Sequence, residues 1–229
     1  MVPESIGGTY TYIFELGRRL ASRGHRFDLI VSTKTLPGGG PEDLEGMRVY
    51  RYPFRRINPV LSTLQHLNKT YNIYSEIEAE EPVDIFSVND SHLGLKIARS
   101  QLGKRACQIP TFHAPLFLEF RLNTGWQVAA EASPFRRAVL RATEPPLEHW
   151  QRRFETKMLE AGQGILVLSR FTRSLIEKHF PTVDLSRVRI IPSGVDTERF
   201  RPAEDRSALR RKLGLPEGAV CLGTVRNLS

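Results

Sequence analysis

The sequence predicts an α/β protein built on a doubly wound, mainly parallel β-sheet. Short apolar runs rich in β-branched residues alternate along the chain with segments whose apolar residues recur at helical spacing. Strands that alternate with helices pair in parallel through right-handed crossovers. A chain of 229 residues is long enough to bury the core that such a sheet requires.

Seven apolar runs are predicted as strands. Their β-branched content and their lack of polar alternation are typical of strands covered on both faces. The predicted strands are residues 27–31, 47–50, 83–88, 106–109, 164–168, 188–191 and 219–225.

Helices are predicted between these strands from periodicity and from end signals. The first has apolar residues on one face from Tyr10 to Leu20 and ends at Gly24. The second runs over residues 64–77 and ends before Pro82. The remaining helices are predicted from side chains that suit an N-cap, which are Asp90 or Ser91, Ser169, and Asp205 or Ser207.

Two stretches break the alternation. Residues 36–46 form a loop rich in proline and glycine. Residues 115–146 have no clean period and mix aromatic, proline and arginine residues. A loop of that length is usually functional or mobile, and both interpretations stay open. The functional one expects its aromatic and basic residues to line one side of a substrate cleft, which the family resemblance described below makes the acceptor side: Phe117, Phe120, Arg121, Trp126, Phe135, Arg136 and Arg137.

The composition is that of a folded protein with a basic surface. Hydrophobic residues make up 40%, charged residues 25%, and the net charge is +8. A solvated basic face is the simplest explanation, and an anionic membrane surface or anionic acceptor is the main alternative. No nucleic-acid motif accompanies the charge, so we expect no nucleic-acid partner. No apolar run approaches the roughly 18 residues of a membrane span, and we expect the cytoplasm as the location, with peripheral contact at the inner membrane face as an addition.

Two places in the sequence are candidates for ligand binding. Gly7 and Gly8 directly precede the first predicted helix, whose free N–H groups and positive dipole end suit a diphosphate, although Gly-Gly before a helix is often only a turn. His113 follows a predicted strand at the edge of the sheet where ligands collect. An imidazole there binds a sugar hydroxyl or transfers a proton, or else it only structures its loop. By contrast, residues 89–92 are predicted to be helix-capping.

Several kinds of site are not expected. The histidines lack partners at metal-ligand spacing, so no metal site is predicted. No nucleophile elbow, Walker loop or Gly-x-Gly-x-x-Gly fingerprint occurs. Cys107 and Cys221 are predicted to be buried in strands, as small hydrophobic residues.

The segment from Ile191 to Pro202, IPSGVDTERFRP, is a strand end followed by a turn and a proline-flanked exit. It resembles the Ile-Pro-Asn-Gly-Val-Asp…Phe-Arg-Pro signature of the family 4 retaining glycosyltransferases, with Ser193 in place of the usual asparagine. Other matches occur in the family's order over nearly the whole chain: residues 3–8 with its Pro…Gly-Gly loop, 16–25 with its Arg-Gly-His helix, 167–169 with its Val-x-Ser element, and 222–226 with the strand that opens its second domain.

The resemblance implies the GT-B arrangement, in which two Rossmann-like domains face each other across a cleft. A sugar passes from a nucleotide-diphosphate donor to a sugar, lipid-linked or other hydroxyl acceptor with retained configuration, without metal or other cofactor. Gly7, Gly8 and Arg226 would contact the donor diphosphate, and His113 would lie near the transferred sugar as the catalytic residue. Pro192, Gly194 and Asp196 would form the interdomain hinge.

The resemblance also implies domain boundaries. Residues 1–190 would be the acceptor-side domain, 191–217 the connection with a helix, and 218–229 the first strand of the donor-side domain. The first strand of the acceptor-side sheet and the paired glutamates of the donor side are not in this sequence, so we expect the 229 residues alone to be inactive and marginally stable. A GT-B-shaped sugar-nucleotide epimerase and a non-catalytic acceptor-binding partner of another chain are the alternatives.

Overall fold

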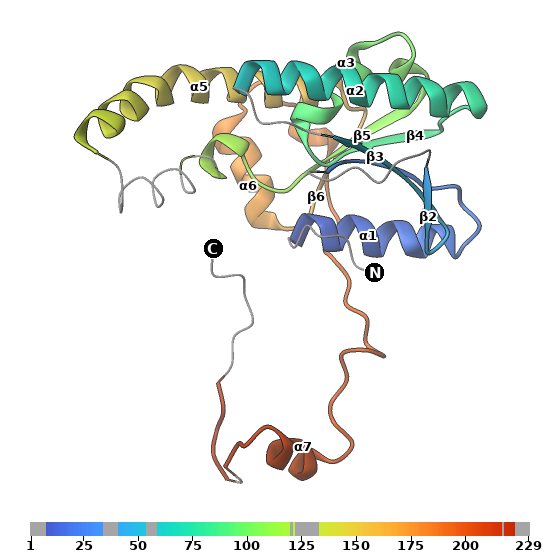
Figure 1. Cartoon of the computed structure of the whole chain (residues 1–229), viewed down its shortest axis with the longest axis vertical. Helices are drawn as coiled ribbons and strands as arrows, with labels where there is room; N and C mark the ends of the chain where they lie inside the picture. The colour runs from blue at the N-terminus through green and yellow to red at the C-terminus, as the bar shows by residue number, and fades with distance from the viewer. Residues whose placement is uncertain are drawn as a thin grey trace. The chain divides into compact units, whose positions relative to one another are not determined.

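The computed structural model describes residues 8–33, 41–53, 59–119, 121, 133–216 and 218–222. By contacts the chain divides into two compact units, residues 1–192 and 193–229 (Figure 1). The strands all belong to the first unit: β1 Asp28–Thr33, β2 Glu42–Leu44, β3 Met47–Pro53, β4 Ile85–Val88, β5 Cys107–Phe112, β6 Ile165–Val167 and β7 Val188–Ile190.

Helices cover this unit, and one more helix lies in the second. They are α1 Gly8–Ala21, α2 Pro59–Glu80, α3 Ser91–Arg99, α5 Pro134–Ala161 and α6 Arg170–His179 in the first unit, with 3₁₀ turns η1 Gly103–Arg105 and η2 Leu185–Arg187, and α7 Arg206–Lys212 in the second. Figure 1 shows α2, α3 and α5 as one layer on one face of the strands, with α1 on the opposite side. The predicted α/β class with parallel strands is confirmed.

The strands form two sheets in the described residues. One has the order β1-β3-β2, in which β1 pairs parallel and β2 antiparallel to β3. The other has the order β4-β5-β6-β7 and is parallel throughout. Among the described strands, β1 and β4 each have a neighbour on one side only, so both lie at the edge of their sheet. Helix α2 contacts both β1 and α3, and so bridges the two sheets.

Six predicted strands are present, each within a few residues of its expected bounds. In the seventh, predicted over residues 219–225, residues 219–222 have no strand conformation, with Val220 and Leu222 90% and 97% exposed, and residues 223–225 lie outside the described residues. A strand requires a hydrogen-bonding neighbour, and no other strand occurs among the described residues of the second unit. Strand β2 was missed because it lies in the predicted loop over residues 36–46.

The hydrophobic core of the second sheet lies between its strands and the helices. Phe112, Phe117 and Phe180 meet edge to face, with ring centroids 5.5 and 6.5 Å from Phe180, beside Val167 and Ile176, which are fully buried. A second cluster joins the other side of the sheet to α3 and α5 through Val88, Leu95, Ala98 and Met158. Phe117 was predicted to line a cleft, and this is wrong: the ring is 2% exposed and belongs to the core.

Two predicted helix caps are confirmed by their hydrogen bonds. Ser169 Oγ accepts from the backbone N of Thr172 at 3.0 Å and begins α6. Asp205 Oδ1 accepts from the N of Ala208 at 2.8 Å and begins α7. Both side chains satisfy an N–H group that the first helical turn leaves without a partner.

Helix α5 starts well inside the stretch that showed no period. Among the α5 residues whose burial is described, the buried ones are Gln151, Glu155, Met158 and Leu159, which all lie beyond that stretch. Pro134 at its first position is preorganised for a helix start. The prediction that both cysteines are buried is also wrong, because Cys107 and Cys221 are free and exposed.

The edge position of β4 leads to a testable prediction. Ile85 is 61% exposed, so Ile85→Lys in the 229-residue chain should change the free energy of unfolding by no more than about 0.5 kcal/mol. It should also reduce aggregation, because a charge on an edge strand opposes pairing with another chain. Urea denaturation and light scattering measure the two effects.

Ile165→Lys is the matched control, since Ile165 is 1% exposed on β6 inside the same sheet. Burying its charge should cost about 4 kcal/mol or more. Equal destabilisation by the two substitutions would contradict the assignment of β4 as an edge.

Candidate functional site

The candidate site lies where β3, β4 and β5 end. The residues that follow β4 and β5 are Asn89, Asp90 and His113, and Tyr52 lies near the end of β3. Parallel strands bring their carboxyl ends to one edge of a sheet, which is where ligands bind in open α/β folds. Helix α1 contributes Tyr12 from the opposite side of the site.

His113 is held by two neighbours. Its Nε2 lies 3.0 Å from Asn89 Oδ1, and the Tyr12 ring meets its imidazole edge to face with centroids 5.5 Å apart. Because an amide oxygen only accepts hydrogen bonds, this contact places the proton on Nε2 and leaves a lone pair on Nδ1. Burial lowers the pKa of His113, so the imidazole is neutral at pH 7 and ready to accept from a hydroxyl group.

Tyr52 and His66 form a second polar pair at this edge. The Tyr52 hydroxyl lies 2.7 Å from His66 Nδ1, and the two rings are 79° apart. Burial raises the pKa of Tyr52, and the charges of Asp90 and Tyr10 add to the shift. Tyr52 therefore stays protonated and serves as a hydrogen-bonding group close to Asp90.

The negative charge of Asp90 affects the pKa of several groups at the site. Beyond Tyr52, its negative charge raises the pKa of Glu119 and of Glu155, in both cases after the larger effect of burial. The capping interpretation of Asp90 is compatible with its position directly before α3, but it missed this second role.

The predicted diphosphate contacts are only partly described. Gly8 is the first residue of α1, it is exposed, and a Cβ built on it would meet nothing within 4 Å. The same helix carries Tyr12 one turn later, so the N-terminal end of α1 lies beside His113. Gly7 and Arg226 lie outside the described residues.

The predicted hinge residues fall on either side of the division between the two units. Pro192 ends the first unit, while Gly194 and Asp196 belong to the second. Asp196 closes a turn, since its Oδ1 accepts from Arg199 N at 3.0 Å and its carbonyl accepts from Phe200 N at 2.9 Å. A hinge role for these residues stays a prediction.

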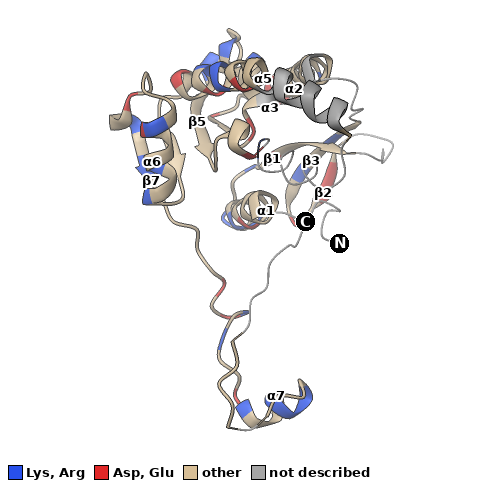
Figure 2. Ribbon diagram, turned by 90° about the vertical axis from the view of Figure 1, so that its left-hand side faces the viewer, with Lys and Arg blue, Asp and Glu red and all other residues tan. Residues whose placement is uncertain are grey.

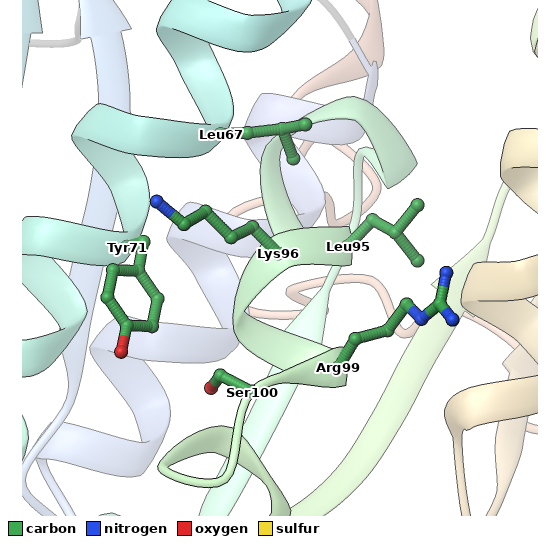
Figure 3. A pocket seen from close by; sticks show the side chains of 6 residues that line it. All are labelled: Leu67, Tyr71, Leu95, Lys96, Arg99 and Ser100. Atoms are coloured by element: carbon green, nitrogen blue, oxygen red, sulfur yellow. The ribbon is translucent and has the colours of Figure 1, made fainter.

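A separate shallow groove of about 430 Å³ lies between α2 and α3 (Figure 3). Lys96 extends across it over the Tyr71 ring, 4.6 Å from the centroid, and donates to Asn68 Oδ1 at 2.7 Å. Arg99 extends the other way in Figure 3. The remaining lining residues are Leu67, Leu95 and Ser100.

Within the described part of the chain, no group of three His, Cys, Asp or Glu side chains is placed to hold a metal ion. The residues that sequence reasoning missed are Asn89, Tyr12 and Glu155. Asn89 could have been selected in the same way as His113, because it also directly follows a predicted strand. Tyr12 and Glu155 carried no such signal, since they reach the site from helices.

Comparison with known proteins identifies the family. The model of Glycosyltransferase Family 4 matches residues 6–199, which include α1, all strands of the first unit and the segment 192–199. Relatives described as D-inositol 3-phosphate glycosyltransferase are 27% identical over 223 residues in Stackebrandtia nassauensis and 28% over 222 residues in Geodermatophilus obscurus. They cover 95% and 94% of this chain, and the chain covers 46% and 45% of them.

The chain thus spans about half the length of these relatives. Among solved structures, a sucrose-phosphate synthase from Thermosynechococcus elongatus matches with a TM-score of 0.55 and 16% identity, covering 89% of this chain and 94% of that one. This likeness shows a shared fold and confirms the predicted GT-B type of α/β domain. The match of the family model over residues 6–199 shows that the chain belongs to Glycosyltransferase Family 4.

Proposed function

We propose that this chain is the acceptor-side part of a glycosyltransferase that moves a sugar from a nucleotide-diphosphate donor to a hydroxyl acceptor, with retained configuration. The match of the family model to residues 6–199 carries the proposal. The relatives named above are glycosyltransferases by description, which supports this function over a sugar-nucleotide epimerase.

In the proposed reaction, the bond between the anomeric carbon and the diphosphate oxygen breaks, and its electron pair leaves with the nucleoside diphosphate. A bond forms from the acceptor oxygen to the same carbon, and the hydroxyl proton is taken up by the departing diphosphate. The N-terminal end of α1 at Gly8 suits the charge that develops there. Gly7 and Arg226 keep their proposed contacts with this group.

His113 is the proposed catalytic residue. Its neutral imidazole, fixed by Asn89 and Tyr12, presents Nδ1 to a hydroxyl of the bound sugar. Asp90 and Glu119 supply carboxylate oxygens that accept from other hydroxyl groups near the same strand ends. The acceptor class is therefore a polyhydroxylated molecule, and the description of the relatives makes inositol 3-phosphate and unphosphorylated inositol the first pair to compare.

A peripheral contact with an anionic membrane is the proposed partner interaction. Exposed cations lie on α3, η1 and α5, which pack side by side: Arg99, Lys104, Arg105, Arg153 and Lys157. None of these five side chains has an ion-pair or hydrogen-bond partner among the described residues. Figure 2 shows basic segments gathered over this end of the helical layer. Each basic residue near an anionic bilayer contributes about 1 kcal/mol.

The groove beside these cations adds apolar surface. Leu67, Tyr71 and Leu95 line it, and Leu64, one helical turn before Leu67, is 51% exposed. Apolar side chains flanked by unpaired cations are the combination that holds a protein at a membrane surface. No described helix is both long and apolar enough to cross a bilayer. The predicted acceptor-side residues Trp126, Phe135, Arg136 and Arg137 lie outside the side chains that the structure describes.

His113→Ala should weaken acceptor binding by roughly tenfold, the loss of about one good hydrogen bond. Titration of wild type and variant with inositol or inositol 3-phosphate, followed by NMR of the backbone amides of Asn89 and Tyr12, measures this, and the imidazole signals of His113 are followed in the wild type. His25→Ala is the control, since His25 is exposed beyond the end of α1. Wild-type affinity should stay constant from pH 8 to pH 6.5, because the lowered pKa keeps His113 neutral. If no hydroxylated acceptor perturbs His113 at millimolar concentration, the proposal fails.

The 229 residues by themselves should release no nucleoside diphosphate from a panel of nucleotide sugars at a useful rate. The physical reason is that the proposed transfer needs groups on both sides of the donor, and the chain spans about half the length of its relatives. Coupled detection of nucleoside diphosphate measures the rate. Turnover on the order of 1 per second or more would contradict the proposal that the transfer needs groups on both sides of the donor.

Lys96→Glu/Arg99→Glu should reduce sedimentation with vesicles rich in phosphatidylglycerol at least tenfold, since it reverses two charges on the groove. The control Arg23→Glu/Lys178→Glu makes the same change in net charge at exposed positions on α6 and beyond the end of α1. Equal losses in the two variants would show that overall charge, and not this face, attracts the membrane. Equal, negligible binding of the wild type to anionic and neutral vesicles would remove the proposal.

A further inference from the structure

Glu155 is a carboxylic acid inside the protein. It lies on α5 between Gln151 and Leu159, and the residue is 3% exposed. A charged carboxylate is rarely buried to this degree without an ion-pair partner. Its Oε2 has no hydrogen-bond partner among the described residues, so only one of its two oxygens is engaged.

The engaged oxygen holds the segment that follows β5. Glu155 Oε1 accepts from the backbone N of Leu116 at 2.9 Å. Leu116 begins a helical stretch, and in its first turn, residues 116–119, the N–H groups of Leu118 and Glu119 donate to the carbonyl of Pro115 at 3.0 and 3.2 Å. The first N–H of a helical turn has no partner within the turn, and Glu155 supplies one from a different helix.

This turn is closely tied to His113. Only Ala114 and Pro115 separate His113 from Leu116. Pro115 is fully buried and has a fixed φ, so the backbone between the imidazole and the turn has little freedom. On the other side of the turn, the buried Phe117 ring has the Arg152 guanidinium 4.5 Å from its centroid.

We propose that Glu155, as a neutral carboxylic acid, is a positioning residue. It fixes the turn over residues 116–119 and, through this turn, the placement of His113. The role of His113 rests on the proposed function, whereas the hold of Glu155 on the turn does not. A carboxylic acid accepts from Leu116 through its carbonyl oxygen without placing a charge in the core.

The charges around Glu155 favour that protonated form. Asp90, at the start of α3, and Glu119, in the turn itself, are negative, and Arg152 on the same helix is positive. Arg152 also donates to Glu148 at 3.0 Å, so its charge is shared. Burial, followed by the repulsion from Asp90 and Glu119, raises the pKa of Glu155 to about 8, against the partial opposition of the Leu116 hydrogen bond and Arg152.

The sign of the pH effect follows from this shift. Between the ordinary pKa of 4.5 and about 8, the folded chain holds a proton on Glu155 that the unfolded chain has released. The free energy of unfolding contributed by this group is therefore fully present below pH 4.5, falls as the pH rises, and is lost above about 8.

The experiment compares Glu155→Gln, Glu155→Ala and the control Glu177→Gln in the 229-residue chain. Glutamine keeps an acceptor for Leu116 but cannot ionise, and Glu177 is exposed on α6. Urea midpoints are measured from pH 4.5 to 9, together with the amide signal of Leu116 and the imidazole signals of His113 by NMR.

Three results are expected. The wild type and Glu177→Gln lose stability from pH 4.5 to 8, and their Leu116 amide titrates near pH 8. Glu155→Gln loses this titration and the associated fall in its urea midpoint, while its His113 signals match those of the wild type at pH 6. Glu155→Ala shifts both the Leu116 and the His113 signals, and glutamine thus rescues what alanine disrupts.

Two results would overturn the proposal. One is a folded Glu155→Ala whose Leu116 and His113 signals are unchanged. The other is a Glu155→Gln whose midpoint follows the pH as the wild type does, which is decisive even if the alanine variant does not fold. Neither readout requires a sugar or a nucleotide, so failure of acceptor binding would reject the proposed function and leave this test intact.

Discussion

The backbone hydrogen bonds that pair β4 with β5 fix the register from Ile85–Cys107 to Val88–Pro110, and the candidate site depends on this register. Val88, the last residue of β4, pairs with Pro110, and β5 continues two residues further to Phe112. Asn89 and His113 therefore follow the ends of two neighbouring parallel strands, close enough for their 3.0 Å contact. A shift of one residue would send His113 to the other face of the sheet. The position of the His113 imidazole, and with it the burial that lowers its pKa, therefore depends on strand pairing in which neither the His113 nor the Asn89 side chain takes part.

Buried polar side chains reinforce this arrangement from behind. Glu155 holds the turn after β5. Gln108, within β5, donates from Nε2 to the carbonyls of Ala98 and Gly103 at 3.0 and 2.9 Å and so joins the strand to α3 and η1. Its backbone N donates to Gln163 Oε1 at 2.6 Å. Such groups destabilise a core unless their partners are in place, and for that reason they select one arrangement of helices around the site.

The division into two sheets shows how far helix packing alone maintains the fold. Helix α2 contacts β1 and α3, and no backbone hydrogen bond between described strands links β1 to β4. The exposed side of β4 leaves Ile85 61% accessible. An edge of this kind is a template for another strand, and this one lies next to the site.

The sequence by itself determined the α/β class, six of the strands and the caps at Ser169 and Asp205, because alternation, β-branched runs and capping side chains act over a few neighbouring residues. It also selected His113 as a residue that follows a strand. Helix α5 was not predictable in its first half, since that half contains Pro145 and Pro146, which a helix interior rarely tolerates.

Only the tertiary structure decided the rest. Tyr12 and Glu155 lie about 100 and 40 residues from His113 in the sequence, and no local pattern connects them to it. Residues 219–222 have the composition of a strand but no neighbouring strand among the described residues, so they do not form one. Local propensity indicates which segments are candidates for a strand or a site. Whether a candidate forms a strand or a site depends on hydrogen bonds and burial that residues distant in the chain provide.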